Sequence, residues 1–140
     1  AFARLFADPA ADTRTRAGEW IAAALPEGAT IGVVSEPWQF DLPPLNPARH
    51  RIVVIPLDAP WPDGPKPQYF VSSDVQFPPV AVRGALTAGE QARYEEVFLG
   101  KGPYIAGKRF EAWPGLKAFL RYGPHDLRYA NPVIVVSARR

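Results

Sequence analysis

The chain has 140 residues, of which 47% are apolar and 21% charged, and its formal net charge at pH 7 is +2. This composition predicts one globular domain spanning residues 1–140 and excludes a disordered chain. Arginines are interspersed with acidic residues, so the sequence lacks the basic stripe that binding to a nucleic-acid backbone requires. The absence of cysteine excludes disulfides, thiolate nucleophiles and Cys-ligated zinc.

The chain also contains no methionine, although translation starts with one. We therefore expect a piece processed or cut from a larger protein. Its first residues lack the charged and apolar regions of a signal peptide. No run approaches the roughly 20 apolar residues of a membrane span, so this piece itself is expected to be soluble.

Residues 12–34 predict a capped helix followed by a buried strand. Asp12 can accept hydrogen bonds from the first turn, and Pro26 and Gly28 end the helix. Residues 30–34 form an apolar run typical of a strand. The apolar residues of the helix recur at spacings of three and four, which gives one buried stripe: Ala17, Trp20, Ile21, Ala24 and Leu25.

The middle of the chain alternates Pro-rich loops with short strands. A loop over residues 36–50 precedes a predicted strand at 51–57, and a second loop at 58–67 precedes a strand at 68–74. Proline lacks a backbone N–H, so neither loop is expected to be a helix or a central strand.

A second helix is expected to begin at Thr87, which stands at capping-box spacing from Glu90. Glycines at 100 and 102 end it, and strands are predicted at 104–113 and 131–140 around an irregular stretch at 114–126. The predicted fold is α/β, with two main helices, a mixed sheet of about five strands, antiparallel C-terminal strands and long Pro-rich loops. In this fold, four residues of the second helix are expected to face the core: Gln91, Tyr94, Val97 and Phe98.

No catalytic constellation is visible. The two histidines, His50 and His125, lie in predicted loops and are expected at the surface. The chain has no HExxH or GxSxG pattern and no Gly-rich loop that opens a helix. We therefore predict no catalytic residue, no metal site and no cofactor.

The candidate binding residues lie on the aromatic loops and at the end of one strand. Apolar side chains on such loops either plug the core or form an exposed patch for a partner, a membrane surface or a sugar face. Polar residues at a strand end most often cap free backbone groups, although ligands also bind there in α/β folds. The candidates are Trp38, Phe40, Asp41, Trp61, Ser72, Ser73 and Asp74.

Four segments in order carry a resemblance to a known family: residues 12–33, 69–74 (YFVSSD), 93–98 (RYEEVF) and 126–139 (DLRYANPVIVVSAR). Together they resemble the C-terminal extracytoplasmic domain of membrane glycosyltransferases that use polyprenyl-phosphate sugars. This superfamily includes protein-mannosyltransferase-like and aminoarabinose-transferase-like enzymes.

The resemblance implies a membrane-embedded region before this chain, with catalysis on an early extracytoplasmic loop that no residue here can match. The domain itself would be non-catalytic, would lie on the periplasmic side and would shape or bind the acceptor. Its implied partners are the membrane part of the same polypeptide and a glycan, lipid-linked sugar or protein acceptor. The sequence departs from the family in the loop at 36–50 and at Trp61.

Two other functions stay open from the residues alone. One is a free-standing glycan- or peptide-binding module that uses the aromatic loops. The other is a small enzyme whose site the sequence does not reveal. An upstream reading frame with several apolar spans would favour the glycosyltransferase over both.

Overall fold

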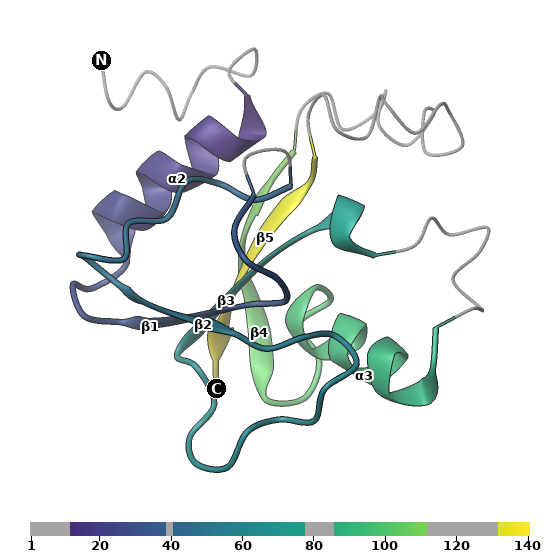
Figure 1. Ribbon diagram of the computed structural model, residues 1–140. Coiled ribbons are helices and arrows are strands. Elements are labelled where there is room, and N and C mark those ends of the chain that lie inside the picture. Colours follow the sequence, from purple (N-terminus) through teal and green to yellow (C-terminus); the bar gives the residue numbers. More distant parts are fainter. Residues whose placement is uncertain (1–11, 39–40, 78–85, 112–131) are drawn as a thin grey trace.

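The computed structural model describes residues 12–38, 41–77, 86–111 and 132–140 (Figure 1). In these residues, two α-helices and five strands follow one another in the predicted order, which confirms the α/β fold. They are α2 (Thr13–Ala24), β1 (Thr30–Val33), β2 (Arg51–Val54), β3 (Tyr69–Ser73), α3 (Ala88–Val97), β4 (Tyr104–Phe110) and β5 (Ile134–Arg139), and a short 3-10 helix, η1 (Asp74–Gln76), follows β3.

The five strands form one mixed sheet in the order β2-β1-β3-β5-β4. Strands β1, β2 and β3 are parallel, whereas β5 pairs antiparallel with both β3 and β4. The predicted antiparallel pair at the C-terminus is therefore confirmed, with β4 at the edge of the sheet and β5 inside it. Consequently the carboxyl ends of β1 and β3 lie beside the start of β5.

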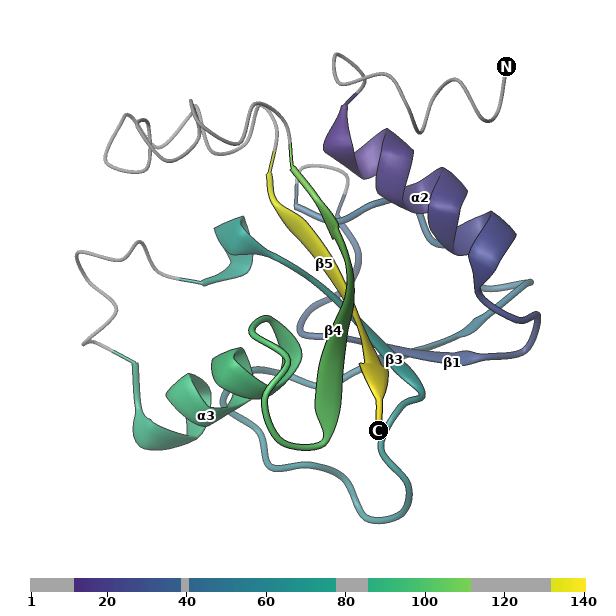
Figure 2. The same ribbon diagram turned by 180° about the vertical axis from the view of Figure 1, so that it is seen from behind.

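Helices α2 and α3 cover opposite faces of this sheet, as the two views in Figures 1 and 2 show. Alternate residues of the central strands supply the two cores, because successive side chains point to opposite faces. Val71, Ile134 and Val136 pack with α2, whereas Phe70 and Val135 pack with α3. Burial on both faces explains why the strands read as continuous apolar runs.

The Pro-rich loops replace the helices that usually join parallel strands. The loop between β1 and β2 places Leu42 and Leu45 in the core on the α2 face. The loop between β2 and β3 places Leu57 and Trp61 on the α3 face. Each loop therefore completes one apolar layer, so the prolines stiffen a packed crossover segment.

Both predicted helix starts are confirmed. The Asp12 side chain accepts a hydrogen bond from the Arg14 N–H, and Thr87 and Glu90 form the reciprocal capping box. The stripe of α2 is buried at Ala17, Ile21 and Leu25. Ala24, expected on that stripe, is exposed in the last turn of the helix.

Two predicted strands are too long. Strand β2 ends at Val54, because Pro56 has no N–H with which to continue the ladder. Ile55 makes the last bond to β1, donating its N–H to Val33 O. Strand β4 ends at Phe110. The predicted irregular stretch at 114–126, with His125, lies outside the described residues.

The expectation of a surface position for His50 is wrong. Its side chain is 2% exposed, and Nε2 lies 3.4 Å from the Leu25 carbonyl oxygen at the end of α2. The turn that begins at Asn46, whose carbonyl accepts the His50 N–H, folds this loop back against the helix. His50 is therefore a packing residue beneath α2.

Candidate functional site

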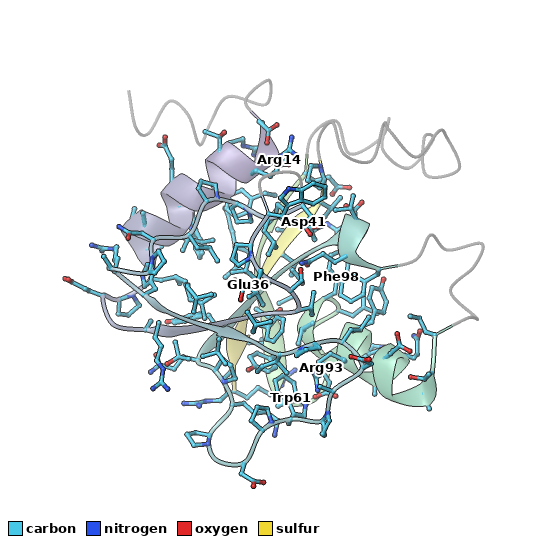
Figure 3. All side chains as sticks on the ribbon, viewed as in Figure 1. Arg14, Glu36, Asp41, Trp61, Arg93 and Phe98 are labelled. Carbon is cyan, nitrogen blue, oxygen red and sulfur yellow. The ribbon has the colours of Figure 1, made fainter. Side chains whose placement is uncertain are left out.

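A pocket of about 640 Å³ lies between the start of α2 and the loop that follows β1. It stands at the carboxyl ends of the parallel strands, where ligands bind in α/β folds. The labels for Arg14 and Asp41 mark this end of the molecule in Figure 3. Its lining combines an apolar loop with a polar helix end: Asp12, Arg14, Thr15, Pro37, Trp38, Leu42, Pro43, Pro44 and Leu45.

Trp38 gives this pocket an exposed aromatic wall. Its side chain is 56% exposed, whereas Leu42 below it is 1% exposed and belongs to the core. Pro44 packs so closely on α2 that a Cβ at Gly18 would lie 2.9 Å from Pro44 Cγ. This close packing holds Pro44 against α2 and so fixes that part of the apolar wall.

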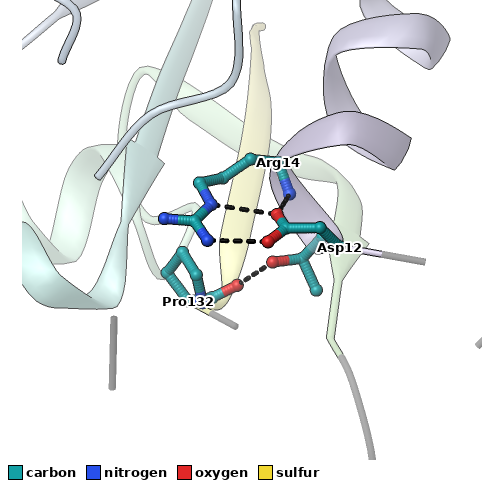
Figure 4. A network of polar contacts seen from close by, with 4 residues as sticks. Asp12, Arg14 and Pro132 are labelled. Atoms are coloured by element: carbon teal, nitrogen blue, oxygen red, sulfur yellow. Dashed lines mark hydrogen bonds and ion pairs between the residues drawn. The ribbon is translucent and has the colours of Figure 1, made fainter. Parts of the chain in front are cut away.

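The polar wall is a fixed ion pair at the first turn of α2 (Figure 4). Arg14 Nε and Nη2 donate to the two carboxylate oxygens of Asp12 at 2.9 and 2.6 Å. This pairing lowers the pKa of Asp12 and raises that of Arg14. Thr13 Oγ1 donates to Pro132 O at 2.6 Å, which ties the start of the helix to β5.

Asp41 adds a second carboxyl group at this end of the sheet. Burial raises the pKa of Asp41, while nearby backbone N–H groups and Arg14 oppose that shift. Its Oδ1 is buried and has no hydrogen-bond partner in the described part of the chain. Asp41 is therefore a desolvated carboxylate beside Arg14, which already bonds the carboxylate of Asp12.

These two aspartates predict opposite pH dependences of stability. The folded pKa of Asp41 lies above its ordinary value of 3.8. Its ionised form therefore costs stability at neutral pH, and this cost is relieved as pH falls through the folded pKa. The folded pKa of Asp12 is lowered, so Asp12 contributes stability above pH 3.8 and loses it as pH falls further.

We therefore expect Asp41→Asn to raise the urea midpoint at pH 7 and Asp12→Asn to lower it. Asparagine keeps the helix cap and the loop acceptor, so each variant changes charge without removing the side-chain oxygen. In acid, the urea midpoint of each variant should approach that of the unmodified protein. For Asp12→Asn this should happen at a lower pH than for Asp41→Asn. Urea unfolding from pH 7 to 3 tests this, and a lower midpoint for Asp41→Asn at pH 7 contradicts it.

Trp61, the aromatic residue of the second loop, lies on the other face of the sheet, beside Arg93 (Figure 3). Its ring stacks on Tyr104 and lies 4.0 Å from the Arg93 guanidinium carbon, while Nε1 donates to Glu96 Oε2 at 3.1 Å. Arg93 also donates to the carbonyl oxygens of Pro56 and Ala59. This cluster fastens the loop to α3, and its half-buried Trp61 lines no part of the Trp38 pocket.

The strand-end candidates are enclosed in the protein. Ser72 and Ser73 are fully buried. Asp74 Oδ1 accepts the Val133 N–H at 3.0 Å, and the Asp74 N–H donates to Val133 O at the same distance. These bonds join the end of β3 to the start of β5, so Asp74 has the backbone-capping role that the sequence favoured. Phe40 lies outside the described residues.

Comparisons with protein-family models, curated proteins and solved structures found no match. The site is therefore interpreted from its own geometry. No helix in the described ranges is long and apolar enough to cross a membrane. Nor do the described residues bring together three histidine or acidic side chains that could hold a metal ion.

The structure brings together Trp38 and Asp41 from the predicted set and separates them from Trp61. It adds Asp12, which the sequence predicted only as a helix cap, and Arg14, which the sequence did not single out. Spacing alone gave no signal that they line a pocket, because this depends on where the loop after β1 returns over α2.

A second hollow of about 340 Å³ lies at the opposite end of β1 and β3. Its charged side chains are Glu27 and Arg139, and Arg139 donates to the Lys66 carbonyl oxygen. It has no exposed aromatic wall comparable to Trp38, so the larger pocket is the stronger candidate.

Proposed function

We propose that this chain is the extracytoplasmic domain of a membrane glycosyltransferase and that it binds the acceptor in the Trp38 pocket. The parent enzyme would transfer a hexosyl or pentosyl group from a polyprenyl-phosphate sugar, at an active site in the membrane-embedded part of the same polypeptide. The domain itself has no catalytic role in this proposal and lies on the periplasmic side of the membrane.

The position of the pocket carries this proposal. Asp12 caps α2 and also lines the pocket, so the pocket lies at the start of α2. The exposed ring of Trp38 at the carboxyl ends of the parallel strands supports a bound acceptor there. The proposal requires this pocket to face the membrane-embedded active site, where an acceptor has to be presented.

The chemistry of the pocket supports binding more than catalysis. Its lining offers one carboxylate, which is held in a bidentate bond by Arg14. General acid–base catalysis needs a group that can reach its substrate and exchange a proton near neutral pH. Asp12 has a lowered pKa, so it stays ionised and suits hydrogen-bond acceptance.

The same pocket also supports a second candidate, a free-standing glycan- or peptide-binding module. The observation that favours it is the exposed ring of Trp38 in the lining of the pocket. Both candidates use the same residues, so mutation of the pocket does not separate them.

The upstream reading frame separates these candidates. The glycosyltransferase proposal predicts that the open reading frame continues N-terminally into several apolar spans, each of roughly 20 residues. A frame that starts immediately before this chain, with no such spans, would overturn it. The free-standing module would then be the better interpretation if the domain still binds its ligand.

A further inference from the structure

We infer that the Trp38 pocket accepts a neutral, polyhydroxylated ligand, the sugar ring of a glycan acceptor, and rejects the phosphate of a lipid-linked donor. This inference rests on the proposed function, because it assigns the pocket to one of the two substrates. The charges of the pocket and the shape of its two walls both favour such a ligand.

Among the described residues, the lining of the pocket offers no net positive charge to an anion. Arg14 is the one cation among the described lining residues, and both carboxylate oxygens of Asp12 bond to it. Asp41 acts on Arg14 as a second negative charge. Asp12, Arg14 and Asp41 together therefore carry a charge of about −1 at neutral pH, which repels phosphate and carboxylate ligands.

The apolar wall suits a flat ring with C–H groups on one face. Trp38 is 56% exposed, and the exposed Pro37 and Pro44 and the half-buried Leu45 extend the surface around it. A sugar ring presents C–H bonds on its faces and hydroxyl groups around its edge. Such a ligand can cover an aromatic ring without placing a polar group against it.

The polar wall suits the hydroxyl edge of the same ring. Asp12 Oδ1 already accepts hydrogen bonds from the backbone N–H and Nε of Arg14, whereas Oδ2 accepts one from Arg14 Nη2. The Asp12 side chain is 36% exposed, so Oδ2 can accept one further hydrogen bond while Arg14 fixes its orientation. Thr15 is exposed at the same wall and offers a hydroxyl group as both donor and acceptor. The carboxylate of Asp12 and the hydroxyl group of Thr15 thus offer acceptors and a donor side by side. This matches neighbouring hydroxyl groups of a sugar, each of which both donates and accepts.

A bilayer surface fits this pocket less well than a sugar does. Membrane binding by a small patch needs basic residues that attract anionic headgroups, in addition to an aromatic anchor. Arg14, the one arginine among the described lining residues, is neutralised by Asp12. The charges around Trp38 therefore favour the uncharged ligand.

NMR titration of the ¹⁵N-labelled 140-residue chain tests this inference. The neutral probes are maltotetraose, β-1,4-mannotetraose and α-1,5-arabinotetraose, and the anionic probes are inorganic phosphate and glucose 1-phosphate. We expect at least one neutral probe, at concentrations up to about 20 mM, to shift the Trp38 indole N–H and the Thr15 amide signals. Neither anionic probe should shift them.

Three variants sharpen the test. Trp38→Ala should weaken binding of the neutral probe by about tenfold or more. Trp61→Phe, on the opposite face, should bind as the unmodified protein does. Asp12→Asn keeps the helix cap and frees Arg14 from one carboxylate, so we expect it to gain a response to phosphate.

The outcomes for the two proposals are distinguishable. If phosphate or glucose 1-phosphate binds as well as the neutral probes, the inferred ligand class is wrong, although a pocket for the donor would still suit the parent enzyme. If no neutral probe shifts the Trp38 signal, the inference is also overturned. The glycosyltransferase proposal fails separately, through an upstream reading frame without apolar spans.

Discussion

Gly100→Ala is expected to lower the free energy of unfolding by more than about 3 kcal/mol. Gly100 has a φ of 70°, which L side chains rarely adopt. A Cβ there would lie 2.3 Å from the Ala106 backbone nitrogen, so the start of β4 would have to move. Urea unfolding followed by circular dichroism measures the loss, and aggregation on expression would agree with it.

Gly64→Ala is the matched control for this prediction. Gly64 also has a positive φ, 94°, but an added Cβ would meet no atom within 4 Å. The control therefore pays only the backbone cost, about 1 kcal/mol. Equal losses for the two variants would show that the turn at Gly100 is not packed against β4 in this way.

Trp61→Ala is expected to lower the free energy of unfolding by about 3 kcal/mol. The substitution removes the stacking on Tyr104, an edge contact with Phe70 and the hydrogen bond to Glu96. It also uncovers Arg93, which is 4% exposed. A double-mutant cycle with Arg93→Met should give a coupling of about 1 kcal/mol or more, because the two side chains share one cluster.

Trp38→Ala is the comparison for Trp61→Ala, because it removes the same side chain from an exposed position. Because its ring is 56% exposed, the expected loss is within about 1 kcal/mol. The two tryptophans thus separate a structural role from a binding role. If both variants lost several kcal/mol, Trp38 would be part of the core and the pocket would have no exposed aromatic wall.

The helices and strands could be predicted because their signals are local. Asp12, Thr87 and the glycines at 100 and 102 determine helix ends through bonds and dihedrals within a few residues of themselves. Apolar runs likewise indicated the five strands. Errors of strand length arose where a proline or the end of a neighbouring strand stopped the ladder, as at Pro56.

The roles of the two aromatic loops could not be predicted, because they depend on where each loop crosses the sheet. Trp38 and Trp61 both lie among prolines, and no neighbouring residue distinguishes them. Arg93 was equally hidden, since its burial depends on the carbonyl oxygens of Pro56 and Ala59, more than thirty residues away. His50 was misplaced for the same reason: its partner is the end of α2.

The candidate site was predictable in part. Trp38 was singled out because apolar side chains on a Pro-rich loop can form an exposed binding patch, and Asp41 lies on the same loop. The opposite wall was missed, because Asp12 already has a sufficient local explanation as a helix cap and nothing in the sequence singles out Arg14. A residue that caps a helix can also line a pocket, and only the returning loop reveals this.

The proposed role of the Trp38 pocket in acceptor binding is tested most directly by transfer kinetics of the proposed parent glycosyltransferase. We predict that Trp38→Ala raises the acceptor KM by about tenfold or more and leaves the KM for the polyprenyl-phosphate sugar unchanged. An unchanged acceptor KM in a folded Trp38→Ala variant, or a rise in the donor KM instead, would contradict this role.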